Sequence, residues 1–158
     1  MKAVVQRVSA GAVAIDGVET ARIGRGYVIL LGVGKGDTEE DAHALAARCA
    51  SLRIMEDAAG KMNLALRDVQ GSALVVSQFT LYADTTRGNR PAFTAAAPPE
   101  EAAQLYEAFL TRMRGILGPE RVASGQFRAM MSVTIVNDGP VTVLVESPTH
   151  NQPRSASS

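Results

Sequence analysis

The fold is decided by residues 4–37, VVQRVSAGAVAIDGVETARIGRGYVILLGVGKGD. Short apolar runs alternate there with turn residues, which predicts strands at 3–9, 12–15, 18–23 and 26–33. Asp16-Gly17 is a dipeptide typical of a two-residue β-hairpin turn. The run 27–34 is continuously apolar and therefore predicts a central strand. The opening third of the chain is expected to form an antiparallel sheet.

Two helices are predicted outside this sheet. The segment 37–52, DTEEDAHALAARCASL, has apolar residues at helical spacing, and either Asp37 or Thr38 can cap it. The segment 99–118, PEEAAQLYEAFLTRMRGILG, has a proline in its first turn and ends at Gly118-Pro119. Further strands are predicted at 52–56, 73–83 and about 132–147.

These elements predict an α+β fold, with a largely antiparallel, barrel-like sheet and two main outer helices. Its length suits one domain, which we expect to span residues 1–147. The polar segment 148–158, rich in serine and proline, is expected to be a disordered tail.

Composition excludes several classes of protein. Sixteen basic and sixteen acidic residues cancel, so bulk charge gives no argument for nucleic-acid binding. No apolar run is long enough to span a bilayer, and the N-terminus lacks the pattern of a signal peptide. The expectation is a cytoplasmic protein without membrane association. Cys49 is the one cysteine, and its position on the apolar helix stripe predicts core packing.

The side chains also limit the chemistry. A serine or cysteine hydrolase usually needs a histidine base, but His43 lies on a predicted helix and His150 in the tail. A zinc site needs several Cys or His ligands, so no metal and no cofactor are expected. The glycines of GVGKGD, 32–37, lack the spacing of a phosphate-binding loop and favour a strand-to-helix turn.

Two stretches remain as candidate sites. In SQFTL, 77–81, small hydroxyl residues flank an aromatic at a strand end, which is also compatible with cross-strand packing. In VTIVNDGPVTVLVES, 133–147, two strand-like runs are broken by NDGP where a hairpin turn is expected. Pro140 has no N–H to donate, so this break is either a tolerated defect or a functional feature. For an X–Pro bond, trans is the default.

Together these stretches resemble the paired signature of the bacterial and eukaryotic D-aminoacyl-tRNA deacylases. The resemblance extends to the flanks and runs from Met1 to about Glu146, through MKAVVQRVSAGAV, GKMNLALRDV, RGNRPAF and AAAPPEEAAQLYEAF. Either motif alone is a weak signal, whereas both in order are specific. The resemblance implies hydrolysis of the ester between a D-amino acid, or glycine, and the terminal adenosine of tRNA, as chirality proofreading in translation.

The resemblance also implies a homodimer with active sites at the interface. One subunit would supply Ser77, Gln78, Phe79 and Thr80, and the other would insert a cis Gly139-Pro140 from the segment that begins at Asn137. Arg7 is similar to a family arginine that holds this segment. Backbone carbonyls beside the substrate α-carbon would accept its ammonium and leave no room for an L side chain.

An aminoacyl ester is already activated, so the protein needs only two contributions for hydrolysis. It must orient the ribose 2′-hydroxyl or a water, and it must stabilise the oxyanion that develops. The N–H of Phe79 is the expected donor, with Ser77 and Gln78 shaping the pocket. One alternative is a Thr80 nucleophile that forms an acyl-enzyme, in a deacylase or in a general esterase. Another is a non-catalytic RNA-binding module on the same fold.

Contact with tRNA is expected at its acceptor end, with Lys61, Arg87 and Arg90 as candidate phosphate contacts or solvated loop charges. No DNA partner is expected. The segment SGQFRAMMSV, 124–133, departs from the family pattern. Members usually have glycine where Arg128 stands, and many have an acidic residue where Met130 stands.

Overall fold

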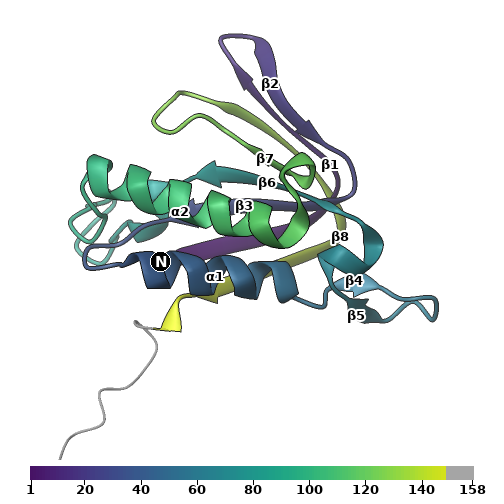
Figure 1. The fold of residues 1–158 in the computed structure, drawn as a ribbon. Coiled ribbons are helices and arrows are strands. Elements are labelled where there is room, and N and C mark those ends of the chain that lie inside the picture. The colour runs from purple at the N-terminus through teal and green to yellow at the C-terminus, as the bar shows by residue number, and fades with distance from the viewer. Residues whose placement is uncertain (149–158) are drawn as a thin grey trace, which may run out of the picture.

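A six-stranded sheet forms the centre of the protein, whose computed structural model describes residues 1–148 (Figure 1). Its strands are β1 (Lys2–Ile15), β2 (Val18–Ile23), β3 (Gly26–Gly32), β6 (Ser72–Ser77), β7 (Val122–Ser124) and β8 (Ser132–Glu146). The strand order is β2-β1-β3-β6-β7, and β8 also pairs with β1. A separate two-stranded sheet contains β4 (Met55–Glu56) and β5 (Met62–Leu64). Most of the predicted tail, residues 149–158, lies outside the described residues.

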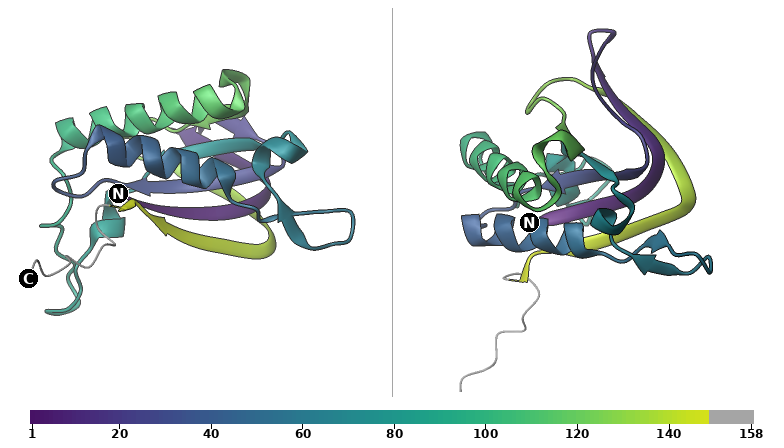
Figure 2. Two further views of the ribbon diagram at one scale, coloured as in Figure 1. Left: turned by 60° about the horizontal axis from the view of Figure 1, so that its bottom comes forward. Right: turned by 45° about the vertical axis from the view of Figure 1, so that its right-hand side comes forward.

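The long strand β1 organises the sheet, because it pairs antiparallel with β2, β3 and β8. Two further pairs, β3 with β6 and β6 with β7, are parallel, so the sheet is mixed. Figure 2 shows β1 and β8 curving together, which gives the sheet its barrel-like form. The predicted α+β fold class is confirmed.

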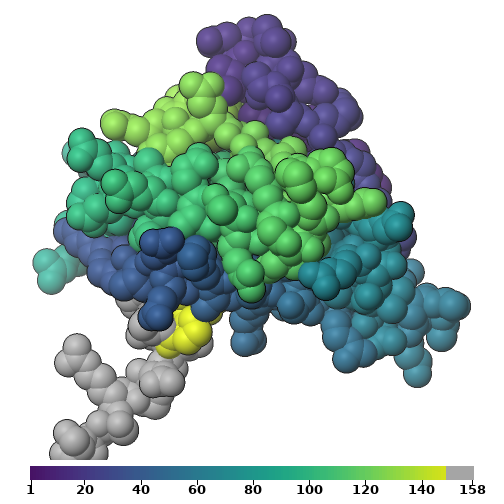
Figure 3. All heavy atoms as spheres, viewed as in Figure 1, coloured from purple at the N-terminus to yellow at the C-terminus, as the bar shows by residue number. Residues whose placement is uncertain are grey.

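The two predicted helices are present as α1 (Glu39–Ser51) and α2 (Pro99–Leu117). Thr38, rather than Asp37, caps α1: its Oγ1 accepts from the Asp41 N–H, and the Asp41 carboxylate accepts from the Thr38 N–H. The helices lie side by side and cover one face of the sheet, and Figure 3 shows their outer surfaces on that face.

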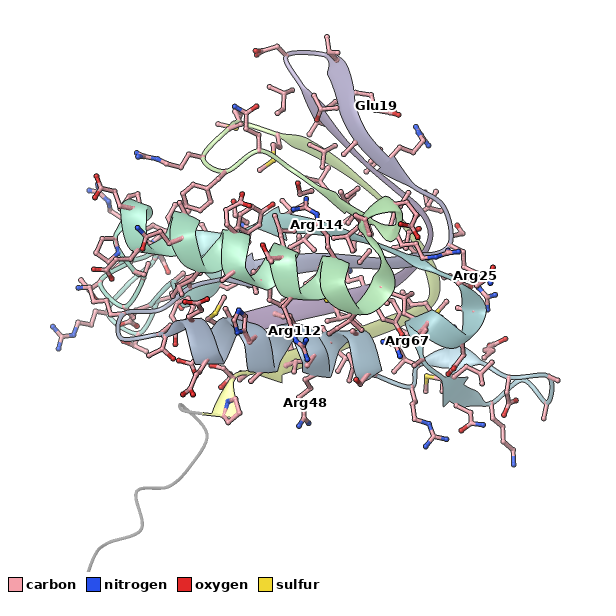
Figure 4. All side chains as sticks on the ribbon, viewed as in Figure 1. Glu19, Arg25, Arg48, Arg67, Arg112 and Arg114 are labelled. Atoms are coloured by element: carbon pink, nitrogen blue, oxygen red, sulfur yellow. The ribbon has the colours of Figure 1, made fainter. Side chains whose placement is uncertain are left out.

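Charged residues at the helix ends complement the helix dipoles. Acidic residues occupy the first turn of each helix, while Arg48 and Arg114 stand in the last turns of α1 and α2. The Arg67 guanidinium donates to the Ile116 carbonyl at 3.0 Å, near the end of α2 (Figure 4). These arginines therefore have a structural role at the helix ends.

The core has two layers because strand residues alternate between the sheet faces. Tyr27, Ile29 and Leu31 of β3 pack in the cluster that includes both helices, and Val28 packs in a second cluster on the opposite face. Cys49 is fully buried in the first cluster, as predicted. Burial raises the pKa of its thiol to about 12, which keeps it protonated at neutral pH.

Some predicted strands have different limits. The runs 3–9 and 12–15 are one strand through Gly11, where a Cβ would lie 2.7 Å from Val28 Cγ2, so glycine permits close approach. The strand predicted at 52–56 is only Met55–Glu56. The strand predicted at 73–83 is wrong beyond Ser77, because the chain turns into the 3₁₀ helix η2 (Phe79–Tyr82).

The hairpin turn considered at Asn137–Pro140 is not formed, because β8 continues through it along β1. Gln6 pairs with Thr142 and Val8 pairs with Asn137, so Arg7 alone stands opposite residues 138–141. These four residues form a wide bulge. Pro140 is tolerated because the residues of the bulge do not pair with β1, so no strand hydrogen bond requires an N–H at that position.

Candidate functional site

A cleft of about 620 Å³ opens where β6 ends. Ser77, Gln78 and Phe79, three of the predicted site residues, line it. The other lining residues come from the end of β3 and the residue after it, from β6, from the segment before α2 and the start of α2, and from the segment before β8 and the start of β8: Leu31, Val33, Val76, Ala96, Ala97, Pro99, Ala102, Phe127, Arg128, Ala129, Met130, Met131 and Val133. The lining is mostly apolar, and its polar side chains are Ser77, Gln78 and Arg128.

The Ser77–Phe79 segment is held at its beginning by the sheet. The Gln78 N–H donates to the Leu31 carbonyl at 2.7 Å, continuing the β3–β6 contact beyond the strand end. Phe79 then begins η2, and its ring packs edge-on against Phe93 with the ring centroids 4.9 Å apart. Because Phe79 remains 59% exposed, its ring stands at the cleft entrance rather than in the core.

Thr80 lies next to this cleft but is absent from its lining residues. Its side chain is exposed, and the Gln78 Nε2 donates to its Oγ1. Among the described residues, the hydrogen bonds of the Thr80 hydroxyl include no histidine or carboxylate partner. The local chemistry therefore gives Thr80 no evident base.

Behind the cleft, Tyr106 of α2 joins two of the walls. Its hydroxyl donates to the Val75 carbonyl at 2.9 Å and lies 3.4 Å from the Gly125 carbonyl oxygen. Burial of the phenol raises the pKa of Tyr106 to about 12. The neutral phenol is thus a fixed donor between β6 and the segment that leads to Phe127.

Arg7 lies under the β8 bulge and is only 5% exposed. Its Nε donates to the Asp138 carbonyl at 2.9 Å, and its Nη1 donates to the Ile54 carbonyl at 2.8 Å. The Asp138 and Glu56 carboxylates, at 3.6 and 3.9 Å, neutralise the guanidinium. Arg7 therefore contacts the segment with which the resemblance associates it.

The bulge itself is not part of the cleft of the same chain. Asn137, Gly139 and Pro140 are exposed, and none of them is a lining residue of the cleft. The Gly139–Pro140 peptide bond is cis, and Gly139 has a φ of 134°. A single chain thus brings Ser77, Gln78 and Phe79 together but leaves the Gly-Pro segment apart from them.

The candidate tRNA contacts also lie apart from the cleft lining. Lys61 is exposed in the β4–β5 connection, where its N–H donates to the Asp57 carboxylate at 3.0 Å. Arg87 and Arg90 are exposed in the loop that is closed by the Asp84–Ala92 bridge. Phe93, which packs against Phe79, directly follows this loop.

The two residues that depart from the family pattern both line the cleft. Met130 is 91% exposed. Arg128 has a φ of 66°, a left-handed conformation that glycine adopts without penalty, which agrees with the glycine expected there.

Sequence reasoning missed Phe93 and Phe127. Their signal was an aromatic residue in an otherwise small and polar loop.

Residues 1–148 contain no cluster of three or more histidine, cysteine, aspartate or glutamate side chains that suits a metal ion. Within that same range, neither helix has both the length and the hydropathy required to cross a membrane.

Residues 4–146 match the family model described as D-Tyr-tRNA(Tyr) deacylase. The chain belongs to this family. Curated relatives named D-aminoacyl-tRNA deacylase include one from Roseiflexus castenholzii, 55% identical over 98% of both chains. Another, from Anaeromyxobacter dehalogenans, is 56% identical over 93% of this chain and 97% of its own length.

Two solved structures share the fold of this deacylase family member. One, named c-Myc DNA Unwinding Element Binding Protein, is 42% identical with a TM-score of 0.89, covering 94% of this chain and 99% of its own. The other, a probable eukaryotic D-amino acid tRNA deacylase, covers 92% and 98% with a TM-score of 0.77. At 17% identity it supports the fold alone. The family and the enzyme class predicted from the sequence are confirmed.

Proposed function

We propose that this protein hydrolyses the ester bond of D-aminoacyl-tRNA and releases free D-amino acid and tRNA. The observation that carries the proposal is the family match over residues 4–146, which includes both SQFTL and NDGPVT. The cleft adds geometric support, because its apolar walls enclose the polar end of β6. By removing D-amino acids, the enzyme would proofread chirality in translation, in the cytoplasm.

We further propose that the protein is a homodimer whose active sites lie at the interface. The β8 bulge supports this, because Gly139 and Pro140 project into solvent while Arg7 fixes the bulge from below. Inserted into the cleft of a second subunit, the Gly139 and Pro140 carbonyls would accept the substrate ammonium. An L side chain would then collide with the bulge, whereas D side chains and glycine would not. Glycyl-tRNA is accordingly a second substrate.

The reaction requires little from protein side chains. Phe79 begins η2, and the first N–H groups of a helix have no acceptor within the helix. We assign the Phe79 N–H as the donor to the oxyanion, with Ser77 and Gln78 shaping the pocket. The ribose 2′-hydroxyl, held next to the ester carbonyl, orients the attacking water. Arg87, Arg90 and Lys61 would contact tRNA phosphates.

A Thr80 nucleophile is the competing mechanism. Replacing Thr80 with alanine separates the two, because the hydroxyl is dispensable if the backbone N–H and the substrate act. We expect the Thr80→Ala enzyme to keep its turnover rate within about threefold. Loss of turnover with intact folding and tRNA binding would establish Thr80 as the nucleophile.

A second candidate function is nucleic-acid binding without catalysis. The relative at 42% identity favours it, since that protein is named for binding a DNA element. Incubation with D-aminoacyl-tRNA, L-aminoacyl-tRNA and a simple ester distinguishes the candidates. Selective hydrolysis of the D form supports the deacylase. Equal loss of both tRNA forms indicates an unselective esterase, and no hydrolysis with retained binding indicates the binder.

A further inference from the structure

The glycine turn between β3 and α1, residues 32–37, contacts two walls of the cleft. The Lys35 N–H donates to the Ala95 carbonyl at 2.9 Å, and the Ala97 N–H donates to the Val33 carbonyl at 3.0 Å. These bonds attach the segment before α2 to the turn. The turn is therefore a strand-to-helix connection, as the sequence favoured, but it also supports the site.

The same turn lies against η2, which carries Phe79. A Cβ on Gly34 would lie 2.6 Å from Cε1, 2.7 Å from Cζ and 2.9 Å from the hydroxyl of Tyr82. A Cβ on Gly32 would lie 3.1 Å from the Gln78 carbonyl oxygen and 3.2 Å from Cδ2 of Tyr82. Neither glycine has a left-handed φ, so close packing is the reason that these positions exclude a side chain.

The Tyr82 ring is held by charged groups as well. The Lys2 ammonium lies 4.7 Å from the ring centroid, and the phenol hydrogen-bonds with Asp37. Asp37 itself accepts from the Gly34 N–H at 2.6 Å and pairs with the buried Met1 ammonium at 2.9 Å. Burial and, next, the Asp37 carboxylate raise the pKa of Tyr82, so the phenol stays protonated as a donor.

We propose that Gly34 and Tyr82 are positioning residues for the cleft. Tyr82 is the last residue of η2, and its ring packs directly against the α-carbon of Gly34. This contact fixes the position of η2 and therefore of Phe79 at its start. The inference rests on the proposed function, since its readout is deacylation. Neither residue lines the cleft, so their effect reaches the substrate through the elements that they contact, chiefly η2.

Gly34→Ala tests the contact, because the added methyl group forces the Tyr82 ring to move. We expect kcat per folded enzyme to fall about tenfold or more, because displacement of a catalytic group by about 1 Å has a large effect on rate. KM for D-aminoacyl-tRNA should change less than about twofold, because neither Gly34 nor Tyr82 is among the proposed tRNA contacts. Gly24→Ala is the matched control: nothing lies within 4 Å of its Cβ position, and kcat should not change.

A double-mutant cycle separates positioning from general destabilisation. In a Tyr82→Leu background, space is available for the methyl group, so Gly34→Ala should lower kcat by less than about twofold. An equal decrease in both backgrounds would overturn the proposal. So would a lower denaturation midpoint with unchanged kcat, because that result indicates a structural role only.

Tyr82→Leu alone provides a second route if Gly34→Ala does not fold. It removes the ring and with it the contact at Gly34, and we expect kcat to fall about tenfold. Unchanged kcat in this variant would overturn the proposal. A wild-type protein that does not hydrolyse D-aminoacyl-tRNA would instead refute the proposed function.

Discussion

The two parts of the proposed site are built in different ways. Ser77–Phe79 follows a strand with four fully or almost fully buried residues, Ala73 to Val76, and lines a cleft within the chain. The 138–141 bulge of β8 is largely exposed and is supported mainly from below, by Arg7. The cleft is formed within one chain, whereas the bulge is exposed and is not part of that cleft. This difference is the reason for proposing a site that two subunits share.

The largest effect is expected from Gly139→Ala, which changes the bulge without touching the cleft. The φ of 134° is unfavourable for alanine, and the new Cβ would lie 2.9 Å from the Val141 N and 3.1 Å from Arg7 Nη2. We predict that kcat/KM for D-aminoacyl-tRNA falls by about 100-fold, together with the preference over the L form. Single-turnover hydrolysis of both forms measures this.

Gly17→Ala is the matched control for that variant. Gly17 has a φ of 77° in the β1–β2 turn, with nothing within 4 Å of its Cβ position. Its replacement should lower stability by about 1 to 2 kcal/mol and leave deacylation unchanged. If Gly139→Ala deacylates like Gly17→Ala, the bulge is not part of the site.

A smaller effect is expected from Arg7→Lys, which weakens the support of the bulge. Lysine keeps the charge but cannot reproduce the two bonds to the Asp138 and Ile54 carbonyls. We predict about tenfold weaker discrimination between D and L substrates and a loss of about 1 to 3 kcal/mol in the free energy of unfolding. Denaturant titration and the D/L rate ratio check both values.

Arg22→Lys provides the comparison, because Arg22 forms two 2.7 Å bonds to Glu19 on the exposed hairpin. Exposed ion pairs contribute less than about 1 kcal/mol, so stability and selectivity should both be nearly unchanged. Equal effects of the two lysine variants would show that Arg7 has no special connection with the bulge.

The smallest perturbation is a cysteine probe, Asn137→Cys, at the exposed start of the bulge. Native Cys49 gives little background at pH 8, since burial raises its pKa to about 12 and the reactive thiolate is suppressed. The probe should react about tenfold more slowly at protein concentrations that favour the dimer, because the partner covers it. A labelling rate that does not depend on concentration would contradict burial of the bulge.

The same thiol gives stability a pH dependence. The pKa of Cys49 in the folded protein lies above the unfolded value of about 8.5, so the unfolded state loses the thiol proton first. The contribution of the protonated thiol to the free energy of unfolding is therefore complete below about pH 8.5 and is lost as the pH rises toward 12. Tyr27 and Tyr106, whose pKa values burial raises to about 12, act in the same direction. The labelling experiment therefore belongs near pH 8, where the fold is unaffected.

The strands and helices with clear periodicity were predictable from the sequence. The segments 18–23 and 99–118 differ from β2 and α2 by at most one residue, because turn and capping residues mark their ends. The strand predicted at 73–83 was wrong beyond Ser77 because Phe79, Thr80 and Tyr82 favour strands individually. The chain instead turns into η2, which packs against Gly32 and Gly34, and local sequence does not reveal that tertiary contact.

For the candidate site, the motifs predicted which residues lie together. Ser77, Gln78 and Phe79 line one cleft, and Arg7 contacts the bulge. Local sequence could not place the bulge, because the NDGP residues satisfy a hairpin and a wide bulge equally well. Pairing with β1, more than 120 residues away along the chain, decides between them. Tyr82 was missed because its partner Gly34 is distant in sequence.

We propose that each active site takes its cleft from one subunit and its bulge from the other. Phe79→Pro removes the proposed oxyanion N–H at the first position of η2, where proline is tolerated, and Gly139→Ala damages the bulge. Each variant alone should be nearly inactive. When equal amounts are unfolded together and refolded, random pairing should restore about one quarter of wild-type activity, because half of the dimers contain one intact site. Activity that stays at the level of the separate variants would contradict a shared site.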